Sequence, residues 1–284
     1  MKNFTISNNL KNQIIDNIVD FLEKVSKVED GELCVPYPED AFYEEDCPIY
    51  TSFFTKDKGK KTKWTFHYGA TKMVFVPNHY NFVIKIPFNC GGEFLCGGDD
   101  IAGCYVNRIL FPYERAIDKD DKDDWNYCKV EEKLYKKAIE NKVDKFFAGT
   151  YFFKNIKVNE EIYPIYISEK VEQNNGILYD TYHSNKEECN KMYRHYKANT
   201  KYECWGVSDE ALLLLSKKYR ESEIWRLLEF IRNFGITDLT NRNCGFTSDG
   251  RLVILDYSGY NEIDDYYDDY YECEEEEYEE EEEY

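Results

Sequence analysis

Residues 234–260 read FGITDLTNRNCGFTSDGRLVILDYSGY, a stretch in which three polar side chains flank a short apolar pattern. Asp238 precedes Asn243 by five positions, and Asp256 follows Asn243 by thirteen. Between the last two lie the apolar segments 244–246 and 252–255, separated by a Ser-Asp-Gly turn at 248–250. The stretch therefore predicts a loop, a β-hairpin and a second loop, with the three polar residues where the strands begin and end.

These three residue types suit phosphoryl transfer. That reaction requires an oriented hydroxyl group and neutralised phosphate charge rather than covalent work by the protein. Asp238 could accept the proton of an attacking hydroxyl, while Asn243 and Asp256 offer the hard oxygen ligands that Mg²⁺ prefers. Each residue taken alone is also common as a loop cap, a turn residue or a strand end. The functional interpretation therefore requires a phosphate-binding lysine elsewhere in the chain.

Such a lysine occurs in the segment 82–87, FVIKIP, where Lys85 interrupts an apolar strand pattern. A lysine inside a buried strand is costly unless an anion accompanies it. Upstream, residues 67–76 predict two strands joined by a turn, with Gly69, Thr71 and Lys72 at its tip. That turn is either a plain hairpin tip or a loop that contacts the same anion.

A helix with a candidate partner for Lys85 is predicted over residues 130–139. Val130, Leu134 and Ala138 recur at helical spacing and define its apolar face. Glu131 and Glu132 both lie on this helix. Glutamates on charged helices are usually solvated, so the helical pattern alone does not decide which of these two glutamates would pair with Lys85.

The order of these features resembles the protein kinase-like superfamily, which includes small-molecule kinases. The resemblance covers about residues 64–260, and it is strongest in 234–260. It implies an α+β, two-lobed fold with a mostly antiparallel amino-terminal sheet and a truncated helical carboxy-terminal lobe. It also implies ATP and Mg²⁺ as cofactors, and transfer of phosphate to an unknown protein or small-molecule hydroxyl group.

The resemblance assigns roles to individual residues. Glu131, which precedes a Leu-Tyr pair by three and four positions, would hold Lys85 on the phosphates. The catalytic residues are then Asp238, Lys85 and Glu131, and the metal ligands are Asn243 and Asp256. The nucleotide-binding residues would be Gly69, Thr71, Lys72 and Lys85 at the phosphates, with Glu169 and Val171 at the interlobe hinge beside the adenine.

Four departures from the family pattern keep other functions open. The loop at Gly69 has one glycine where the family has three, Ile236 stands where many members have histidine, and Asp256 is followed by Tyr-Ser instead of Phe-Gly. No helical segment is predicted after Tyr260, which argues against a peptide-binding groove. The main alternative is a kinase-like pseudoenzyme or adaptor that binds a protein partner. Nucleotidyl transfer is a third.

The predicted organisation has four parts within 284 residues, of which 42% are hydrophobic. Residues 1–63 form an extension with a helix at 8–28 and a loop at 29–61. Residues 64–171 form the amino-terminal lobe, with an insertion at 89–127 and strands at 146–157 and 161–171. Residues 172–260 form the carboxy-terminal lobe, which has helix fragments and loops up to residue 206. A helical segment then begins at Ser208 and is broken near residues 220–222. Residues 261–284 form an acidic tail.

The tail contains 15 Asp or Glu, six Tyr and no Lys or Arg, and so supplies most of the formal net charge of −20. A block of like charges repels itself and is normally disordered. It is either a solubilising tail, a nucleic-acid mimic that docks on a basic protein surface, or an autoinhibitory segment, and its tyrosines could be phosphorylated. Such acidity argues against direct binding of nucleic acid.

Composition also bears on location. No run of about 18 apolar residues occurs, and the first residues lack the apolar region of a signal peptide. These features predict a cytoplasmic protein that does not bind membranes. The Asn-, Tyr- and Lys-rich composition resembles that of phage and other viral proteins, which would place it in the host cytoplasm. The ten cysteines show no C-x-x-C pair and are expected to be reduced thiols, although Cys90, Cys96 and Cys104 could bind zinc within a glycine-rich loop.

Overall fold

The computed structural model describes residues 6–29, 32–35, 64–69, 71–77, 80–89, 108–111, 126–172, 186–197, 206–237, 239–257 and 259–260. Over these residues the chain is α+β, with antiparallel sheets and five α-helices. It divides into two compact units, Met1–Glu172 with Phe246–Val253, and Gln173–Gly245 with Ile254–Tyr284. None of the helices in the described ranges is long and apolar enough to cross a bilayer.

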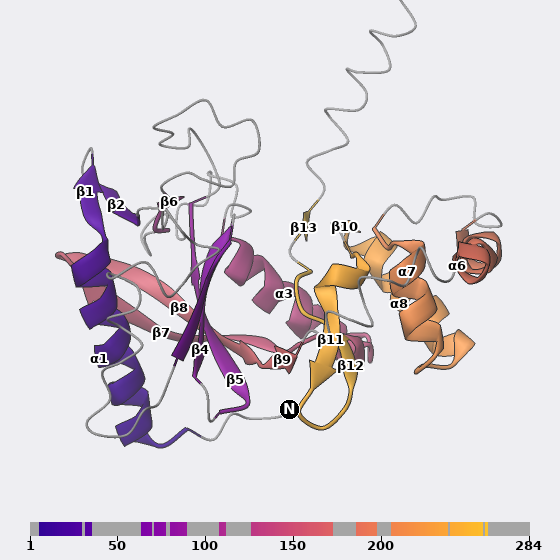
Figure 1. Cartoon of the computed structure of the whole chain (residues 1–284), viewed down its shortest axis with the longest axis horizontal. Helices are drawn as coiled ribbons and strands as arrows, with labels where there is room; N and C mark the ends of the chain where they lie inside the picture. Colours follow the sequence, from indigo (N-terminus) through magenta and orange to yellow (C-terminus); the bar gives the residue numbers. More distant parts are fainter. Residues whose placement is uncertain are drawn as a thin grey trace, which may run out of the picture. The chain divides into compact units, whose positions relative to one another are not determined.

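A five-stranded antiparallel sheet forms the centre of the first unit (Figure 1). Its order is β3 (Trp64–Tyr68), β4 (Lys72–Pro77), β5 (Phe82–Pro87), β8 (Glu161–Glu169) and β7 (Thr150–Val158). The strands predicted around Lys85 and on either side of residue 160 are thus confirmed. The strand expected to begin at residue 146 begins four residues later, because Asp144–Phe146 form a 3₁₀ turn.

The β7–β8 hairpin has a two-residue turn, and its second strand contains a proline. Asn159 and Glu160 both have positive φ, 47° and 72°, which matches the twist of the strands that they join. Pro164 lies in β8, where it pairs with Asn155 of β7. The pairing of β8 with β5 covers only residues 166–169. Pro164 therefore lies on a stretch with one neighbouring strand, where a missing N–H is tolerated.

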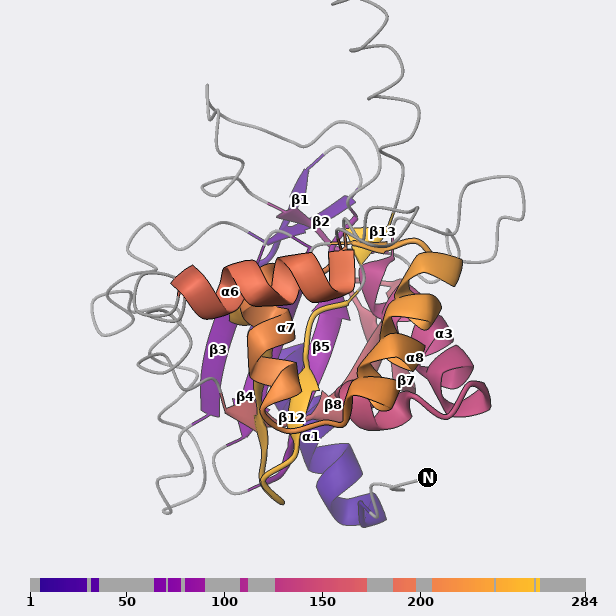
Figure 2. The ribbon, with the colours of Figure 1, turned by 90° about the vertical axis from the view of Figure 1, so that its right-hand side faces the viewer.

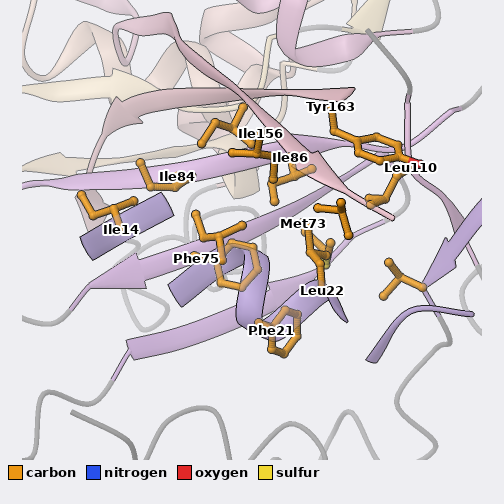
Figure 3. Packing of buried hydrophobic residues seen from close by; sticks show 14 of the residues in the cluster. Ile14, Phe21, Leu22, Met73, Phe75, Ile84, Ile86, Leu110, Ile156 and Tyr163 are labelled. Carbon is orange, nitrogen blue, oxygen red and sulfur yellow. The ribbon is translucent and has the colours of Figure 1, made fainter. Parts of the chain in front are cut away.

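The two faces of this sheet differ in character because side chains alternate along each strand. One face is apolar and is covered by α1 (Asn8–Val25). In Figure 3, Phe21 and Leu22 of that helix lie against Met73 and Phe75 of β4. The rings of Phe21 and Phe75 meet edge to face, with centroids 5.3 Å apart. This arrangement confirms the predicted helix, although it ends at Val25 rather than at residue 28.

The opposite face carries polar side chains and receives α3 (Tyr127–Glu140). The side chain of Asn126 caps this helix by accepting a hydrogen bond of 3.0 Å from the Lys129 amide. Val130, Leu134 and Ala138 are buried, as the helical spacing predicts. The observed helix extends three residues further toward the amino terminus than the apolar pattern indicates, because capping and not hydrophobicity sets its start.

A small sheet in the first unit corrects the prediction of a loop at residues 29–61. Its strands are β1 (Lys27–Glu29), β2 (Glu32–Val35) and β6 (Arg108–Ile109), in that order. Residues 29–61 were expected to be a loop, and that expectation is wrong at β2. β6 lies within the segment 89–127, which was predicted only as an insertion. The pairing joins segments more than 70 residues apart, and no local pattern reveals it.

The helices of the second unit are α6 (Lys186–Met192), α7 (Asp209–Ser216) and α8 (Glu221–Asn233). Residues Tyr193–Lys197 continue α6 as a π-helical turn, and α6 crosses α7 in Figure 2. The Ser208 side chain caps α7 by accepting a hydrogen bond of 3.2 Å from the Ala211 amide. Ser208 and the break before α8 lie where the sequence predicted them.

Short strands follow α8. Gly235, with φ 58°, ends the helical segment in a conformation that favours glycine. The next residues form β10 (Ile236–Thr237), which pairs with β13 (Gly259–Tyr260). The predicted hairpin is present as β11 (Cys244–Thr247) and β12 (Leu252–Ile254), and β11 pairs with β9 (Val171–Glu172).

Several predictions concern residues outside the described ranges. They include the catalytic residue Asp238, the loop of residues 36–61, the glycine-rich segment with Cys90, Cys96 and Cys104, and the acidic tail 261–284. Asp238 lies between two described residues, Thr237 of β10 and Leu239. The Leu239 amide donates a hydrogen bond of 2.7 Å to the Gly206 carbonyl.

Candidate functional site

A buried ionic cluster lies on the polar face of the central sheet in the first unit. Lys85 of β5 and Lys72 of β4 both donate to the carboxylate of Glu131 on α3. The Lys85 Nζ to Oε2 and the Lys72 Nζ to Oε1 distances are both 2.5 Å. The side chains of Lys72, Lys85 and Glu131 are 8%, 7% and 0% exposed. Two ammonium groups therefore share one carboxylate away from solvent.

Helical spacing explains why Glu131 takes this position. It lies one turn before Leu134 and Tyr135 on the buried stripe of α3, so its side chain faces the sheet. The adjacent Glu132 instead makes a surface pair of 2.7 Å with Lys136, whose side chain is 60% exposed. The structure thus brings the predicted pair of Lys85 and Glu131 together.

Two hydroxyl groups from β7 and β8 hold the Glu131 carboxylate in place. The Thr150 hydroxyl donates to Glu131 Oε2 over 3.1 Å. Thr150 lies opposite Ser168 in the strand register, with the two hydroxyl oxygens 3.0 Å apart. Because the single proton of Thr150 is directed to the carboxylate, Ser168 donates to Thr150. The sequence alone did not identify either residue as part of the site.

The loop between β3 and β4 is arranged differently from the expectation. The Gly69 amide donates to the Lys72 carbonyl over 3.0 Å, and the Thr71 carbonyl accepts a bond of 2.9 Å from Phe88. Lys72 was expected at the exposed tip with Gly69 and Thr71. It is instead the first residue of β4, and its side chain is buried in the ionic cluster.

A partly buried ion pair in the same unit joins Glu169 at the end of β8 to Arg251 of the hairpin. Arg251 Nη2 lies 2.7 Å from both carboxylate oxygens, and the Gly149 amide donates to Oε2 over 2.9 Å. Arg251 Nη1 also donates to the carbonyls of Lys145 and Phe147, over 3.3 and 3.5 Å. The predicted adenine-side residue Glu169 therefore uses its side chain to fasten the hairpin tip to the sheet.

The electrostatics around this pair favour the charged form of Arg251. Burial tends to lower the pKa of Arg251, but the hydrogen bond and the negative charge of Glu169 outweigh burial and raise that pKa. Burial also raises the pKa of the nearby Tyr135 and Tyr151 hydroxyls.

Val171, the other predicted hinge residue, lies in β9 opposite Thr247 of β11.

In the second unit, the backbone holds Asn243 and Asp256 near each other. Asn243 ends the 3₁₀ turn Asn241–Asn243, and its carbonyl accepts a hydrogen bond of 2.8 Å from the Leu255 amide. Asp256 is the next residue after Leu255. Two strand ends are thus held side by side, one carrying a side-chain amide and the other a carboxylate.

A pocket of about 320 Å³ opens beside this turn in the second unit. Every residue that lines it is polar or charged: Ser208, Glu210, Thr240, Asn241, Arg242 and Asn243. Glu210 and Arg242 give it one charge of each sign. Its chemistry suits a small polar molecule and not an aromatic or lipid ligand.

The donor set of Asn243 and Asp256 fits Mg²⁺, which is commonly held by one or two protein oxygens together with water and phosphate oxygens. Within the described ranges no group of three or more His, Cys, Asp or Glu side chains could hold a metal ion. Asn243 and Asp256 do not form such a group. A site made only of protein ligands, such as a structural zinc site requires, is therefore not seen in the part of the chain that the structure describes.

The thiol of Cys244, at the start of β11, leads to a prediction about reactivity. Burial raises its pKa to about 12. At pH 8 it should therefore hold about a thousandfold less thiolate than an ordinary thiol of pKa about 8.5. Iodoacetamide labelling followed by peptide mass spectrometry should find Cys244 protected in the folded protein and labelled after unfolding in urea. Equal labelling rates in the two states would contradict this environment.

The four cysteines within the described ranges, Cys34, Cys128, Cys189 and Cys244, are buried, and none of them forms a disulfide with another of the four.

Comparison with known proteins adds no family: no family model matches the sequence, and no curated protein matches it. The class of protein has to be inferred from the residues and their geometry.

Proposed function

We propose that this protein is an ATP- and Mg²⁺-dependent phosphotransferase with the two-lobed architecture of the protein kinase-like superfamily. The observation that carries the proposal is the buried ion pair between Lys85 on a central strand and Glu131 on a helix. A lysine there is expensive to bury and is not needed for packing, since the other face of the sheet is a complete apolar core. Buried, charge-paired groups of this kind are candidates for functional sites.

Each residue then has a defined role. Glu131, held by Thr150, orients Lys85 to donate hydrogen bonds to phosphate oxygens. Asn243 and Asp256 would hold Mg²⁺ through their side-chain oxygens, and the metal would neutralise phosphate charge. The acceptor hydroxyl attacks the γ-phosphorus, ADP leaves with the electrons of the broken bond, and the hydroxyl proton passes to the carboxylate of Asp238.

The polar pocket of the second unit favours a small hydrophilic acceptor. Its lining belongs to the segment that follows Asp238 and to the first turn of α7. Hydroxyl groups of such an acceptor could hydrogen-bond to the amides of Asn241 and Asn243, while Glu210 and Arg242 would favour a molecule that carries charge. A peptide acceptor would need a larger surface than this pocket provides.

Substitution of the metal ligand tests the proposal. Asp256→Asn should lower Mg²⁺-dependent release of ADP from ATP by about a hundredfold or more, because the carboxylate that helps to hold the metal is lost. Asp249→Asn, in the turn of the same hairpin, is the matched control and should retain turnover. Far-ultraviolet circular dichroism should show that both variants are folded.

Two results would contradict the proposal. Wild-type turnover that persists unchanged in Asp256→Asn would remove the metal assignment. Transfer of the α-phosphate, followed with α- and γ-labelled ATP, would replace phosphoryl transfer with nucleotidyl transfer.

A further inference from the structure

Gly206, three residues before α7, lies at a very close approach of two backbone segments in the second unit. A Cβ atom at this position would lie 2.1 Å from the Ile236 carbonyl oxygen and 2.9 Å from Cγ2 of Ile231. Both separations are below 3.0 Å, closer than Cβ atoms essentially ever come to another atom. Ile236 belongs to β10, which pairs with β13, so its carbonyl is held in a sheet. Position 206 therefore requires glycine because no side chain fits there.

The close approach allows two hydrogen bonds that hold Leu239 from both sides. The Leu239 amide donates to the Gly206 carbonyl over 2.7 Å, and the Ser208 amide donates to the Leu239 carbonyl over 3.0 Å. Val207 and Leu239 thereby form a parallel bridge. Both residues are 1% exposed, and backbone hydrogen bonds away from water are costly to leave unmade. We call this arrangement of residues 206–208 and Leu239 the backbone clamp.

The backbone clamp joins the two chain segments that line the polar pocket. One segment continues into Ser208 and Glu210, and the other continues from Leu239 into residues 240–243. The residue before Leu239 is Asp238, the proposed proton acceptor. A shift of Leu239 would therefore move the two halves of the pocket lining relative to each other, next to the residue that is proposed to take the proton.

A packing role alone is the simpler explanation of a glycine at such a contact. It would account for the approach to Ile231 of α8, because a small residue lets neighbouring segments pack closely. Packing predicts that a larger side chain lowers stability and impairs ATP binding and turnover alike. Positioning predicts a loss of turnover that leaves ATP binding almost unchanged.

We propose that Gly206 is a positioning residue for the acceptor side of the phosphotransferase. Its missing side chain lets residues 206–208 fix Leu239, and Leu239 in turn fixes the pocket residues that follow it. Gly206 acts through the backbone and not by contact with the substrate. The inference rests on the proposed function for its consequence in catalysis, while the clamp itself is measurable without catalysis.

The test compares Gly206→Ala with Gly250→Ala in the full chain. Gly250, in the turn of the β11–β12 hairpin, has φ 78° and nothing within 4 Å of an added Cβ, so alanine there is strained locally but does not clash. Amide hydrogen exchange of Leu239 should be at least about tenfold faster in Gly206→Ala than in wild type, because the clamp opens. In Gly250→Ala the exchange of Leu239 should match wild type.

The kinetic arm measures Mg²⁺-dependent release of ADP from ATP by the same variants. Gly206→Ala should lower kcat about ten- to a hundredfold, the loss expected when a reacting group is misplaced. KM for ATP should stay within about twofold, because Lys85 and Glu131, which are proposed to serve the phosphates, belong to the first unit. Gly250→Ala should retain the wild-type kcat.

A second pair of variants serves if Gly206→Ala does not fold. Ser208→Pro removes the amide that donates to Leu239, and the φ of −71° at Ser208 suits proline. Ser208→Ala keeps that amide, and both variants lose the hydroxyl that caps α7. Leu239 exchange should be faster, and kcat lower, in the proline variant than in the alanine variant.

The outcomes separate this inference from the proposed function. Unchanged exchange of Leu239 in Gly206→Ala would overturn the clamp. Faster exchange with an unchanged kcat would leave Gly206 a packing role only, and a rise in KM for ATP as large as the loss of kcat would indicate general damage to the fold. A wild type without ATP turnover would refute the phosphotransferase and the catalytic role of Gly206, whereas faster Leu239 exchange in Gly206→Ala would still support the clamp.

Discussion

Glu131→Ala should lower the free energy of unfolding by about 3–5 kcal/mol, the cost of removing one partner of a buried ion pair. The substitution takes away the carboxylate that Lys72 and Lys85 share, and with it the acceptor of the Thr150 hydroxyl. Both ammonium groups remain on the buried face of the sheet. Urea unfolding followed by circular dichroism should report the loss as a lower midpoint.

Glu132→Ala is the control for this experiment because it removes the neighbouring glutamate of the same helix. In the Glu132–Lys136 pair the Lys136 side chain is 60% exposed and the Glu132 side chain 15%, and solvent-accessible pairs contribute at most about 1 kcal/mol. Equal midpoints for the two variants would show that the carboxylate of Glu131 does not hold the cluster together.

Arg251→Met should cost about 3 kcal/mol, within the range for breaking a buried pair. Arg251 is 21% exposed at its side chain and binds the Glu169 carboxylate with a single nitrogen shared between both oxygens. Its other terminal nitrogen reaches the carbonyls of Lys145 and Phe147. Arg251→Lys should lose most of the same stability, because one ammonium group cannot reach both the Glu169 carboxylate and the carbonyls of Lys145 and Phe147.

A double-mutant cycle with Glu169→Gln measures the pair directly, and a coupling of about 0.5–3 kcal/mol is expected for contacting residues. Arg226→Met serves as the control, since Arg226 lies on an exposed face of α8. A coupling near zero would mean that Arg251 stabilises the hairpin without Glu169.

The helices and strands whose apolar residues form a recognisable local pattern could be predicted from the sequence. The apolar stripe of α1 repeats at helical spacing, and the strand around Lys85 is a short apolar run; the structure has both elements. Ser208 as a helix cap predicted the start of α7, and Gly235 predicted the end of the helical segment after α8. The β1–β2–β6 sheet was missed, because its short strands are stabilised by partners distant in sequence and carry no period of their own.

A residue of the candidate site could be predicted from the sequence only where its side chain departs from the hydrophobic pattern of its own segment. Lys85 interrupts an apolar strand, and that contradiction identified it. Lys72 stands at the boundary of a turn, where a lysine is unremarkable, and its burial depends on the register between β4 and β5. Thr150, Ser168 and Arg251 likewise acquire their roles from strand pairing, which a single sequence does not encode in any local signal.

The most direct test of the proposed phosphotransferase is a calorimetric titration of ATP into the full chain, with Mg²⁺ and with EDTA, for wild type and Lys85→Met. We expect Mg²⁺ to tighten ATP binding at least about tenfold, because the metal would neutralise phosphate charge, and we expect the Lys85 variant to lose that binding. No heat and no thermal stabilisation of wild type by Mg²⁺-ATP would contradict the account, and would favour a kinase-like adaptor that acts by binding a protein partner.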